Sequence, residues 1–264
     1  MISIDWNPMP YLGPIPINWY GITFAIAALT ARWLALRSAS HGFSSTSVDR
    51  LVLWILIGVV VGARLYYVLQ NDFGFYVTHP WRVLAVWEGG LAFFGGLGGG
   101  IASGYVYCRR YSLDFLEVAD IFAPTIPVAA AIGRISCGLD GMDYGTPTSL
   151  PWGIVYLNPN SYAPVDRVPR HPDQYYELAG DLVIAALLVR LRGRLPRGGL
   201  LLVYLVSFSI LRFFIFFVRG NVPVIALGLK NAQWTSLLIL LASLAVMLRK
   251  RVSAYARESA PRKR

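Results

Sequence analysis

Seven apolar stretches separated by short polar segments run through this chain of 264 residues. An α-helix needs about 20 apolar residues to cross the hydrocarbon core of a bilayer. Only 14% of the residues are charged, whereas soluble domains carry about 25%. The pattern therefore predicts an all-α polytopic membrane protein with seven transmembrane helices. These helices are expected at roughly 19–36, 51–69, 91–107, 115–135, 176–191, 199–218 and 234–248.

Basic residues mark alternate ends of these stretches. Arg37 and Arg50 follow the first stretch, and Arg109 and Arg110 follow the third. Cytoplasmic loops carry an excess of Lys and Arg, so the N-terminus is expected outside and the C-terminus inside. The net charge of +10 lies in short clusters between apolar stretches, which favours contact with anionic lipid over nucleic-acid binding. The later clusters are Arg190, Arg192, Arg194 and Arg197 after the fifth stretch and Arg249, Lys250 and Arg251 after the seventh.

Two outer segments are long for connections between membrane helices. They cover residues 70–90 and 137–174, and the second is rich in Pro, Asn, Asp and Tyr, with a strand expected at Trp152–Leu157. Outer loops of this length are more often functional than connective. We expect one membrane domain over residues 1–250, with a small outer head at about 137–174. A basic cytoplasmic tail over residues 251–264 is expected to follow it.

The cysteines and the N-terminal segment limit other interpretations. Cys108 and Cys137 are expected at opposite membrane faces, so a disulfide bond between them is not expected. No Cys or His spacing suggests a metal site. The first 16 residues carry no Lys or Arg and so lack the basic region of a cleavable signal peptide. The first apolar stretch is therefore expected to be retained.

Two arginines within apolar stretches carry the strongest functional signal. Arg134 lies in the glycine-rich segment Gly133–Gly145, whose glycines are expected to end the helix, and Arg212 lies well inside the sixth stretch. A charge at bilayer depth costs roughly 2.5–3.5 kcal/mol on insertion scales, so it needs a polar partner or ligand. One interpretation is a structural ion pair, with Asp120 or Asp181 as the partner of Arg212. The other is a site in which guanidinium forks bind a phosphate.

Further segments place polar or small residues at the outer ends of the stretches. Tyr20 opens the first stretch and belongs either to an aromatic interface belt or to a pocket. Gly95 and Gly96 in the third stretch allow either close helix packing or the approach of a lipid chain. His171 precedes the fifth stretch and is either structural or a titratable site residue. The arginines that lie near the outer ends of the second and sixth stretches are Arg64 and Arg219.

Seven short segments occur in a fixed order along the chain. They are WYG at Trp19–Gly21, GAR at Gly62–Arg64, WEGGL at Trp87–Leu91, AD and AP within Ala119–Pro124, GR at Gly133–Arg134, RHPDQYYE at Arg170–Glu177, and LRFF with a later Arg within Leu211–Arg219. No single segment is specific, but their order and spacing resemble the prolipoprotein diacylglyceryl transferase family of bacterial inner membranes.

The resemblance implies a seven-helix membrane body with a periplasmic head. It also implies transfer of the diacylglyceryl group of phosphatidylglycerol to the lipobox cysteine of a prolipoprotein, which forms a thioether and releases glycerol phosphate. No metal or organic cofactor is implied. By resemblance Arg134 and Arg212 stabilise the leaving phosphate and Tyr20 is a pocket residue. The phosphatidylglycerol site is expected to include Arg64, Arg134, Arg212, Arg219, Gly95, Gly96, Asp140 and Gly145.

Several positions depart from the family pattern. Family members usually carry a histidine at the position of Phe94, where it is proposed to help deprotonate the thiol. Cys137 and Asp140 stand where asparagines are usual, and Met142 stands where a glutamate is usual. Phenylalanine cannot take a proton, but a thiol of pKa near ~8.5 needs only modest help. His171 is the substitute base that the sequence offers.

Three functions are consistent with these features. The first is an active diacylglyceryl transferase. The second is a diverged member that binds anionic phospholipid without this activity, or with another acceptor, as the replacement of the histidine by Phe94 suggests. The third is a transporter or channel for small anions, but the cytoplasmic halves of the stretches are apolar, and this argues against a continuous polar path.

Overall fold

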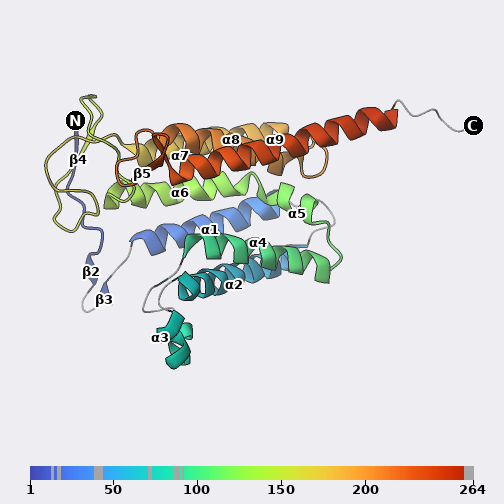
Figure 1. Ribbon diagram of the computed structural model, residues 1–264, viewed down its shortest axis with the longest axis horizontal. Helices are drawn as coiled ribbons and strands as arrows, with labels where there is room; N and C mark the ends of the chain where they lie inside the picture. The colour runs from blue at the N-terminus through green and yellow to red at the C-terminus, as the bar shows by residue number, and fades with distance from the viewer. Residues whose placement is uncertain are drawn as a thin grey trace, which may run out of the picture. The chain divides into compact units, whose positions relative to one another are not determined.

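The computed structural model describes residues 1–12, 15–16, 19–38, 44–70, 73–85, 90 and 92–258 (Figure 1). The chain divides into two units, Met1–Ala31 together with Phe122–Arg264, and Arg32–Ile121. A helix occupies each expected stretch, and the fourth stretch is shared by two helices. These helices are α1 (Trp19–Ser38), α2 (Ser45–Gln70), α4 (Phe93–Arg110), α5 (Phe115–Phe122), α6 (Thr125–Asp140), α7 (Asp173–Leu191), α8 (Gly199–Ile215) and α9 (Asn231–Glu258).

The fourth stretch bends where α5 meets α6. The two helices are inclined by 41°, and Pro124 lies between them. Proline lacks an amide hydrogen and restricts the residue before it, so a continuous helix is disfavoured here. Helix α6 continues past Gly133 and Arg134, but it ends within the glycine-rich segment Gly133–Gly145, as expected. It ends at Asp140, because Gly141 takes a φ of +79°, a left-handed conformation typical of helix ends.

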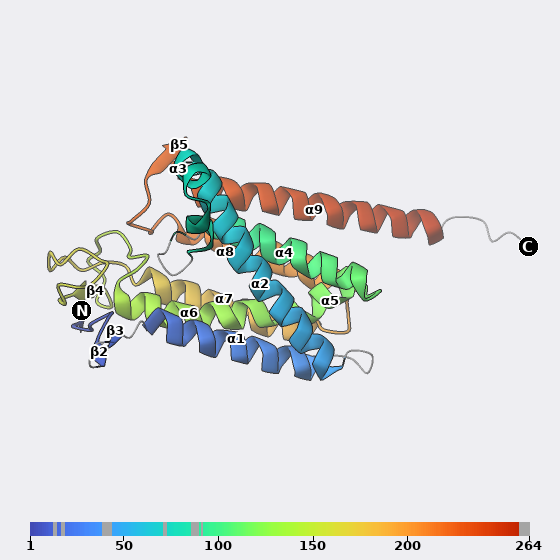
Figure 2. The ribbon, with the colours of Figure 1, turned by 90° about the horizontal axis from the view of Figure 1, so that it is seen from below.

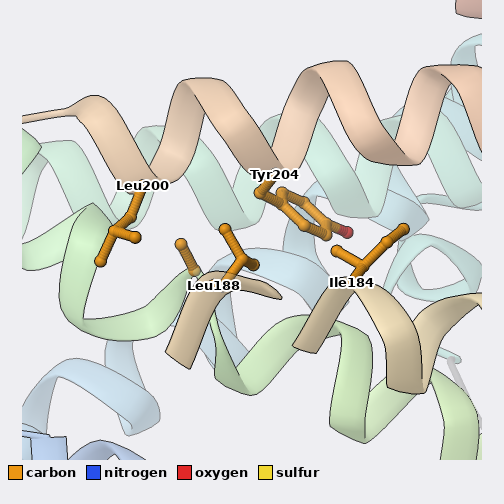
Figure 3. Close-up of a cluster of buried hydrophobic side chains, with 5 residues drawn as sticks. Ile184, Leu188, Leu200 and Tyr204 are labelled. Carbon is orange, nitrogen blue, oxygen red and sulfur yellow. The ribbon is translucent and has the colours of Figure 1, made fainter. Parts of the chain in front are cut away.

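In the first unit, α6, α7, α8 and α9 pack as successive neighbours (Figure 1). Ile184 and Leu188 of α7 contact Leu200 and Tyr204 of α8 in the apolar cluster drawn in Figure 3. Lipid tails are as apolar as these side chains, so close packing rather than exclusion of water holds such helices together. The last turns of α9 continue beyond the neighbouring helices in both views (Figure 2).

The segment between α6 and α7 forms a small head that contains the expected strand. Strand β4 (Ile154–Tyr156) pairs in parallel with β1 (Ile2–Ile4) near the N-terminus. The hydroxyl of Tyr156 donates to the carbonyl of Gly138 at 2.9 Å, which ties the head to the end of α6. The all-α expectation thus holds for the helical body but not for the head. The other strands are β2 (Tyr11–Leu12), β3 (Ile15–Pro16), β5 (Val224–Ala226) and β6 (Leu229–Lys230).

The second unit is built on a glycine contact between α2 and α4. A Cβ added to Gly62 would lie 2.8 Å from the Cα of Gly99, so the two backbones touch where side chains would normally separate them. Small residues allow this close approach between membrane helices. The short helices α3 (Phe73–Thr78) and η1 (Pro80–Leu84) follow α2 along the chain.

The length and hydropathy of the helices are consistent with a membrane protein. Two of them are long and apolar enough to cross a bilayer: α2, with a mean hydropathy of 2.1, and Asn231–Arg249 of α9, with a mean hydropathy of 1.6. The bent pair of α5 and α6 would supply a third crossing, and α8 is a shorter apolar helix. These counts concern the described part of the chain. Seven crossings, and the orientation of the ends, stay predictions.

Candidate functional site

The two arginines singled out from the sequence contact the same carboxylate. Nη2 of Arg134 on α6 lies 2.5 Å from Oε2 of Glu177, and Nη1 of Arg212 on α8 lies 2.5 Å from its Oε1. Glu177 is in the second turn of α7, the helix that packs against both α6 and α8. Its side chain is only 2% exposed. Three helices therefore meet at one buried acid.

Arg219, which follows the end of α8, adds a third guanidinium to this cluster. Its Nη1 lies 2.6 Å from Asp143, its Nη2 lies 3.0 Å from Glu177, and its Nε pairs with Asp173. Asp173 and Glu177 are four residues apart and so share one face of α7. Asp143 also accepts a hydrogen bond from Arg134 at 2.7 Å. We call these six residues, three arginines and three acids, the arginine cluster.

The backbone at Arg219 is attached to the head. Gly145 forms an antiparallel bridge with Arg219, and the amide of Gly220 donates to the carbonyl of Tyr144 at 2.8 Å. A Cβ at Gly145 would lie 2.6 Å from the Cβ of His171, so a larger residue would force the segments apart. Gly145 is thus needed for close approach of the backbone.

The three guanidinium groups differ in their exposure. The side chains of Arg134 and Arg212 are 20% and 22% exposed, whereas that of Arg219 is 2% exposed. Among the described residues, Nε and Nη2 of Arg212 have no hydrogen-bond partner. Arg219 is already paired with three acids. The side chains of Arg134 and Arg212 are therefore partly open to an anion, while that of Arg219 is enclosed.

One aromatic ring lies against two of the arginines. The Cζ atoms of Arg212 and Arg219 are 4.5 Å and 4.9 Å from the ring centroid of Phe216. A guanidinium within about 6 Å of a ring centroid is attracted by the ring quadrupole. Phe216 is itself only 4% exposed. The ring is therefore fixed by packing, and it restricts the position of both guanidinium groups.

Asp143 is the acid of the cluster that lies outside the helices, in the turn after α6. Burial raises its pKa, but Arg219 and Arg134 lower it by more, so the pKa lies below the ordinary value. A carboxyl beside cations is stabilised in its charged form. Asp143 therefore remains a carboxylate at neutral pH and balances part of the arginine charge.

The acids that pair with Arg212 and Arg134 differ from those that the sequence suggested. Arg212 pairs with Glu177 rather than with Asp120 or Asp181. Asp140, expected in the lipid site, ends α6, and its main-chain carbonyl accepts a hydrogen bond from the amide of Tyr162 at 2.9 Å. No ion pair joins its carboxyl to the arginine cluster among the described residues. The acid that pairs with Arg134 in the turn is Asp143 instead.

Arg64, Gly95 and Gly96 belong to the second unit. The buried guanidinium of Arg64 donates to main-chain carbonyls, from Nε to Val83 at 2.9 Å and from Nη1 to Gly90 at 3.1 Å. These bonds hold the segment after α3 against α2. Gly95 and Gly96 lie on the face of α4 that packs against α2, as the packing interpretation of these glycines requires.

His171 lies at the start of α7 but is not joined to the arginine cluster by a hydrogen bond or ion pair within the described residues. Its half-buried ring places Nδ1 3.4 Å from the hydroxyl of Tyr176. The indole of Trp152 donates to the same hydroxyl at 2.8 Å. The side chains of Tyr20 and Phe94 lie outside the described residues.

Sequence reasoning missed the acids that organise the site. Glu177 enters it only as the last residue of the segment Arg170–Glu177, and Asp173 is given no role. The available signal is the spacing of Asp173, Glu177 and Asp181 at the start of an apolar helix. An acid in such a helix needs a partner as much as an arginine does. Within the described residues, no group of three or more His, Cys, Asp or Glu is arranged to hold a metal ion.

An arginine cluster in which two arginine side chains are partly exposed, set among apolar helices, defines the class of this chain. It is a helical membrane protein with a candidate site for an anionic group. The sequence profile of the prolipoprotein diacylglyceryl transferase family matches residues 9–249. The chain therefore belongs to this family and is a transferase of lipoprotein biosynthesis.

Relatives that carry the name of this family support the same membership. The chain is 34% identical to a phosphatidylglycerol–prolipoprotein diacylglyceryl transferase of Cupriavidus pinatubonensis, over 98% of this chain and 95% of that protein. It is 35% identical to a protein of the same name from Methylibium petroleiphilum, over 93% and 97% of the two chains. A Legionella pneumophila relative of that name is 34% identical, over 78% and 80%.

Proposed function

We propose that this chain transfers the diacylglyceryl group of phosphatidylglycerol to the lipobox cysteine thiol of prolipoproteins and releases glycerol phosphate. It acts in the bacterial inner membrane as a multi-pass protein whose head faces the periplasm. One observation carries the proposal: Arg134 and Arg212 converge on Glu177, and their side chains remain 20% and 22% exposed. The family membership supplies the class of reaction.

The reaction needs cations where charge develops. The thiolate sulfur attacks the glycerol carbon that bears the phosphate ester, a carbon–sulfur bond forms, and the carbon–oxygen bond breaks. The bonding electrons pass to the phosphate oxygen of glycerol phosphate, and the thiol proton goes to a base or to solvent. Preorganised cations stabilise the charge that gathers on the leaving phosphate. Arg134 and Arg212 are assigned this role.

Glu177 supports this assignment although it already pairs with both arginines. A guanidinium has five N–H donors, and Arg212 uses one of them on Glu177. The remaining edge can donate to a phosphate while the carboxylate fixes the orientation of the group. Glu177 is therefore assigned as the residue that holds the two cations in one geometry, and the phosphate would bind at their exposed side.

The other expected residues take lesser or separate places in the proposal. Arg219 is buried and forms ion pairs with Asp143, Asp173 and Glu177, so it is assigned the role of holding these acids in place. Gly145 permits the backbone contact with Arg219. His171 is kept as the candidate proton acceptor. Tyr20 is kept as a catalytic pocket residue. The remaining sequence-based assignments to the phosphatidylglycerol site are Arg64, Gly95, Gly96 and Asp140.

Substitution of the arginines tests the proposal. With phosphatidylglycerol and a lipobox peptide, the purified protein should form the diacylglyceryl thioether. Arg134→Ala should lower the rate by roughly 10²–10³, as expected for loss of one preorganised donor. Arg212→Lys should lose most activity as well, because a point charge replaces a planar fork. Mass spectrometry of the peptide measures the product.

Arg190→Ala is the matched control, because this exposed arginine lies at the far end of α7. It should retain the rate of the unaltered protein. No thioether with the unaltered protein, with phosphatidylglycerol bound, would support the diverged lipid-binding member suggested by Phe94. Near-normal transfer by Arg212→Lys would contradict the role given to the guanidinium fork.

A further inference from the structure

Lys230 is a buried lysine at the junction of β6 and α9. It is only 9% exposed. Its Nζ donates to the carbonyl of Phe216 at 2.8 Å and also to the carbonyl of Arg219. Its amide donates to Oε1 of Gln233 at 2.9 Å, and Nε2 of Gln233 donates to the carbonyl of Phe213 at 3.1 Å. Two side chains of one segment therefore bind three carbonyls near the end of α8.

These contacts meet a general need of helix ends. The last four carbonyls of an α-helix have no amide partner in the same helix. Helix α8 ends at Ile215, and Lys230 and Gln233 supply donors to carbonyls on either side of this end. A lysine near a helix C-terminus also interacts favourably with the helix dipole. The end of α8 is therefore fixed to the start of α9.

The fixed segment carries two members of the arginine cluster. Arg212 lies in the last turn of α8, and Arg219 follows the helix. Phe216, whose carbonyl Lys230 binds, is also the ring that contacts both guanidinium groups. A displacement of this turn would therefore move both arginines relative to Glu177.

Burying the ammonium group of Lys230 costs free energy unless its N–H groups donate hydrogen bonds. Burial lowers the pKa of Lys230, Asp173 raises it, and Arg219 lowers it further. Replacing buried charges by well-packed apolar residues of similar volume is often neutral or stabilising. A structural need for volume alone could be met by methionine. The ammonium donors and their two carbonyl partners are what methionine would lack.

We propose that Lys230 is a positioning residue that, together with Gln233, holds Arg212 and Arg219 in the geometry that binds the phosphate of the lipid. The proposal rests on the proposed function only for the identity of the anion. It concerns a lysine that contacts no substrate and acts through the end of α8.

Lipid binding by the full chain in detergent tests this role. The probe is a short-chain phosphatidylglycerol, titrated by calorimetry. Lys230→Met should raise the dissociation constant about tenfold, which corresponds to roughly 1.4 kcal/mol. Lys230→Arg, which keeps the donors, should restore binding to within about threefold. Ser236→Ala is the control, because the hydroxyl of Ser236 bonds only within α9 and its loss should leave binding unchanged.

Combination with Arg212→Lys separates positioning from a general loss of stability. If Lys230 acts through Arg212, Lys230→Met should weaken binding less than about twofold in the Arg212→Lys background, because coupled residues are non-additive. Fully additive losses, or unchanged binding by Lys230→Met alone, would overturn the proposal. If Lys230→Met does not fold, Gln233→Leu removes the donor to Phe213 and is expected to show the same coupling. Additivity there would also overturn it.

The result is distinct from a failure of the proposed function. Coupled loss of lipid binding, without thioether formation by the unaltered protein, would leave the role of Lys230 intact and remove the transfer activity. Thioether formation by the unaltered protein, together with additive effects of Lys230→Met and Arg212→Lys on binding, would support the transfer activity and remove the role of Lys230. Absence of phosphatidylglycerol binding by the unaltered protein would overturn the positioning role.

Discussion

At the scale of single residues, the arginine cluster divides into exposed and enclosed cations. The side chains of Arg134 and Arg212 are 20% and 22% exposed, while that of Arg219 is 2% exposed and ion-paired with three acids. Removing a partner from a buried charge is strongly destabilising because it leaves an uncompensated charge. Substitutions at Arg219 should therefore affect folding, whereas those at Arg134 and Arg212 should affect reaction more than folding.

The question of the proton acceptor also belongs to this scale. Nδ1 of His171 lies 3.4 Å from the hydroxyl of Tyr176, which already accepts from Trp152. If Nδ1–H donates to this hydroxyl, Nε2 is left with a lone pair and can take the thiol proton. His171→Ala should then lower kcat by roughly 10²–10³ and remove the acidic limb of the pH–rate profile. Tyr176→Phe should reduce kcat less, since it removes only the orienting hydroxyl.

The measurement is the pH dependence of transfer by each variant. Trp152→Phe serves as the control for disturbance of the head, because it removes a donor to Tyr176 without touching His171. A pH–rate profile of His171→Ala that matches the unaltered protein would reject His171 as the base. The proton would then have to leave to solvent or to another group.

At the scale of elements, the contact of α2 with α4 makes a prediction about stability. A Cβ on Gly62 would lie 2.8 Å from the Cα of Gly99, whereas a Cβ on Gly98 would meet nothing within 4 Å. Gly62→Ala should therefore destabilise by about 1–3 kcal/mol, the usual cost of overpacking. Gly98→Ala should be neutral or stabilising by up to about 1 kcal/mol, because alanine favours the helix. Thermal unfolding in detergent compares them, and equal midpoints would contradict the close contact.

The elements show what local sequence can predict. Each long helix is found in its expected stretch, because apolar length and helix propensity are local properties. The end of α6 lies within the glycine-rich segment Gly133–Gly145, as expected, but the sequence does not show which of its glycines ends the helix. Strand β4 was expected near Trp152–Leu157, but its partner β1 lies at the other end of the chain. Pairing over such a separation leaves no local signal.

In the candidate site, too, local features could be predicted from the sequence and contacts between distant segments could not. Arg134 and Arg212 could be predicted, because each charge stands out within an apolar stretch. Their convergence on Glu177 could not, because it depends on how α6, α7 and α8 pack. Lys230 lies beyond the hydrophobic stretch of α8, in a short strand that shows no motif. Its importance appears only through the carbonyls that it binds.

At the scale of the whole molecule, hydropathy alone identifies fewer crossings than the seven that the sequence predicts. Two helices, or three with the bent pair, meet the criterion in the described part of the chain, although seven stretches are expected. Helix α7 carries Asp173, Glu177 and Asp181, which lower its hydropathy. Each of the first two pairs with an arginine, so the polar residues face the protein interior, where bilayer-depth charges are tolerated.

This view predicts that the head and the connection between α7 and α8 lie on opposite sides of the membrane. Cysteine labelling in spheroplasts tests it, since the native Cys108 and Cys137 are buried. Asn160→Cys in the exposed head should react with an impermeant maleimide, and Arg194→Cys only after permeabilisation. The same variants labelled in detergent control for accessibility. Labelling of Arg194→Cys in intact spheroplasts would contradict the orientation and, with it, a crossing by α7.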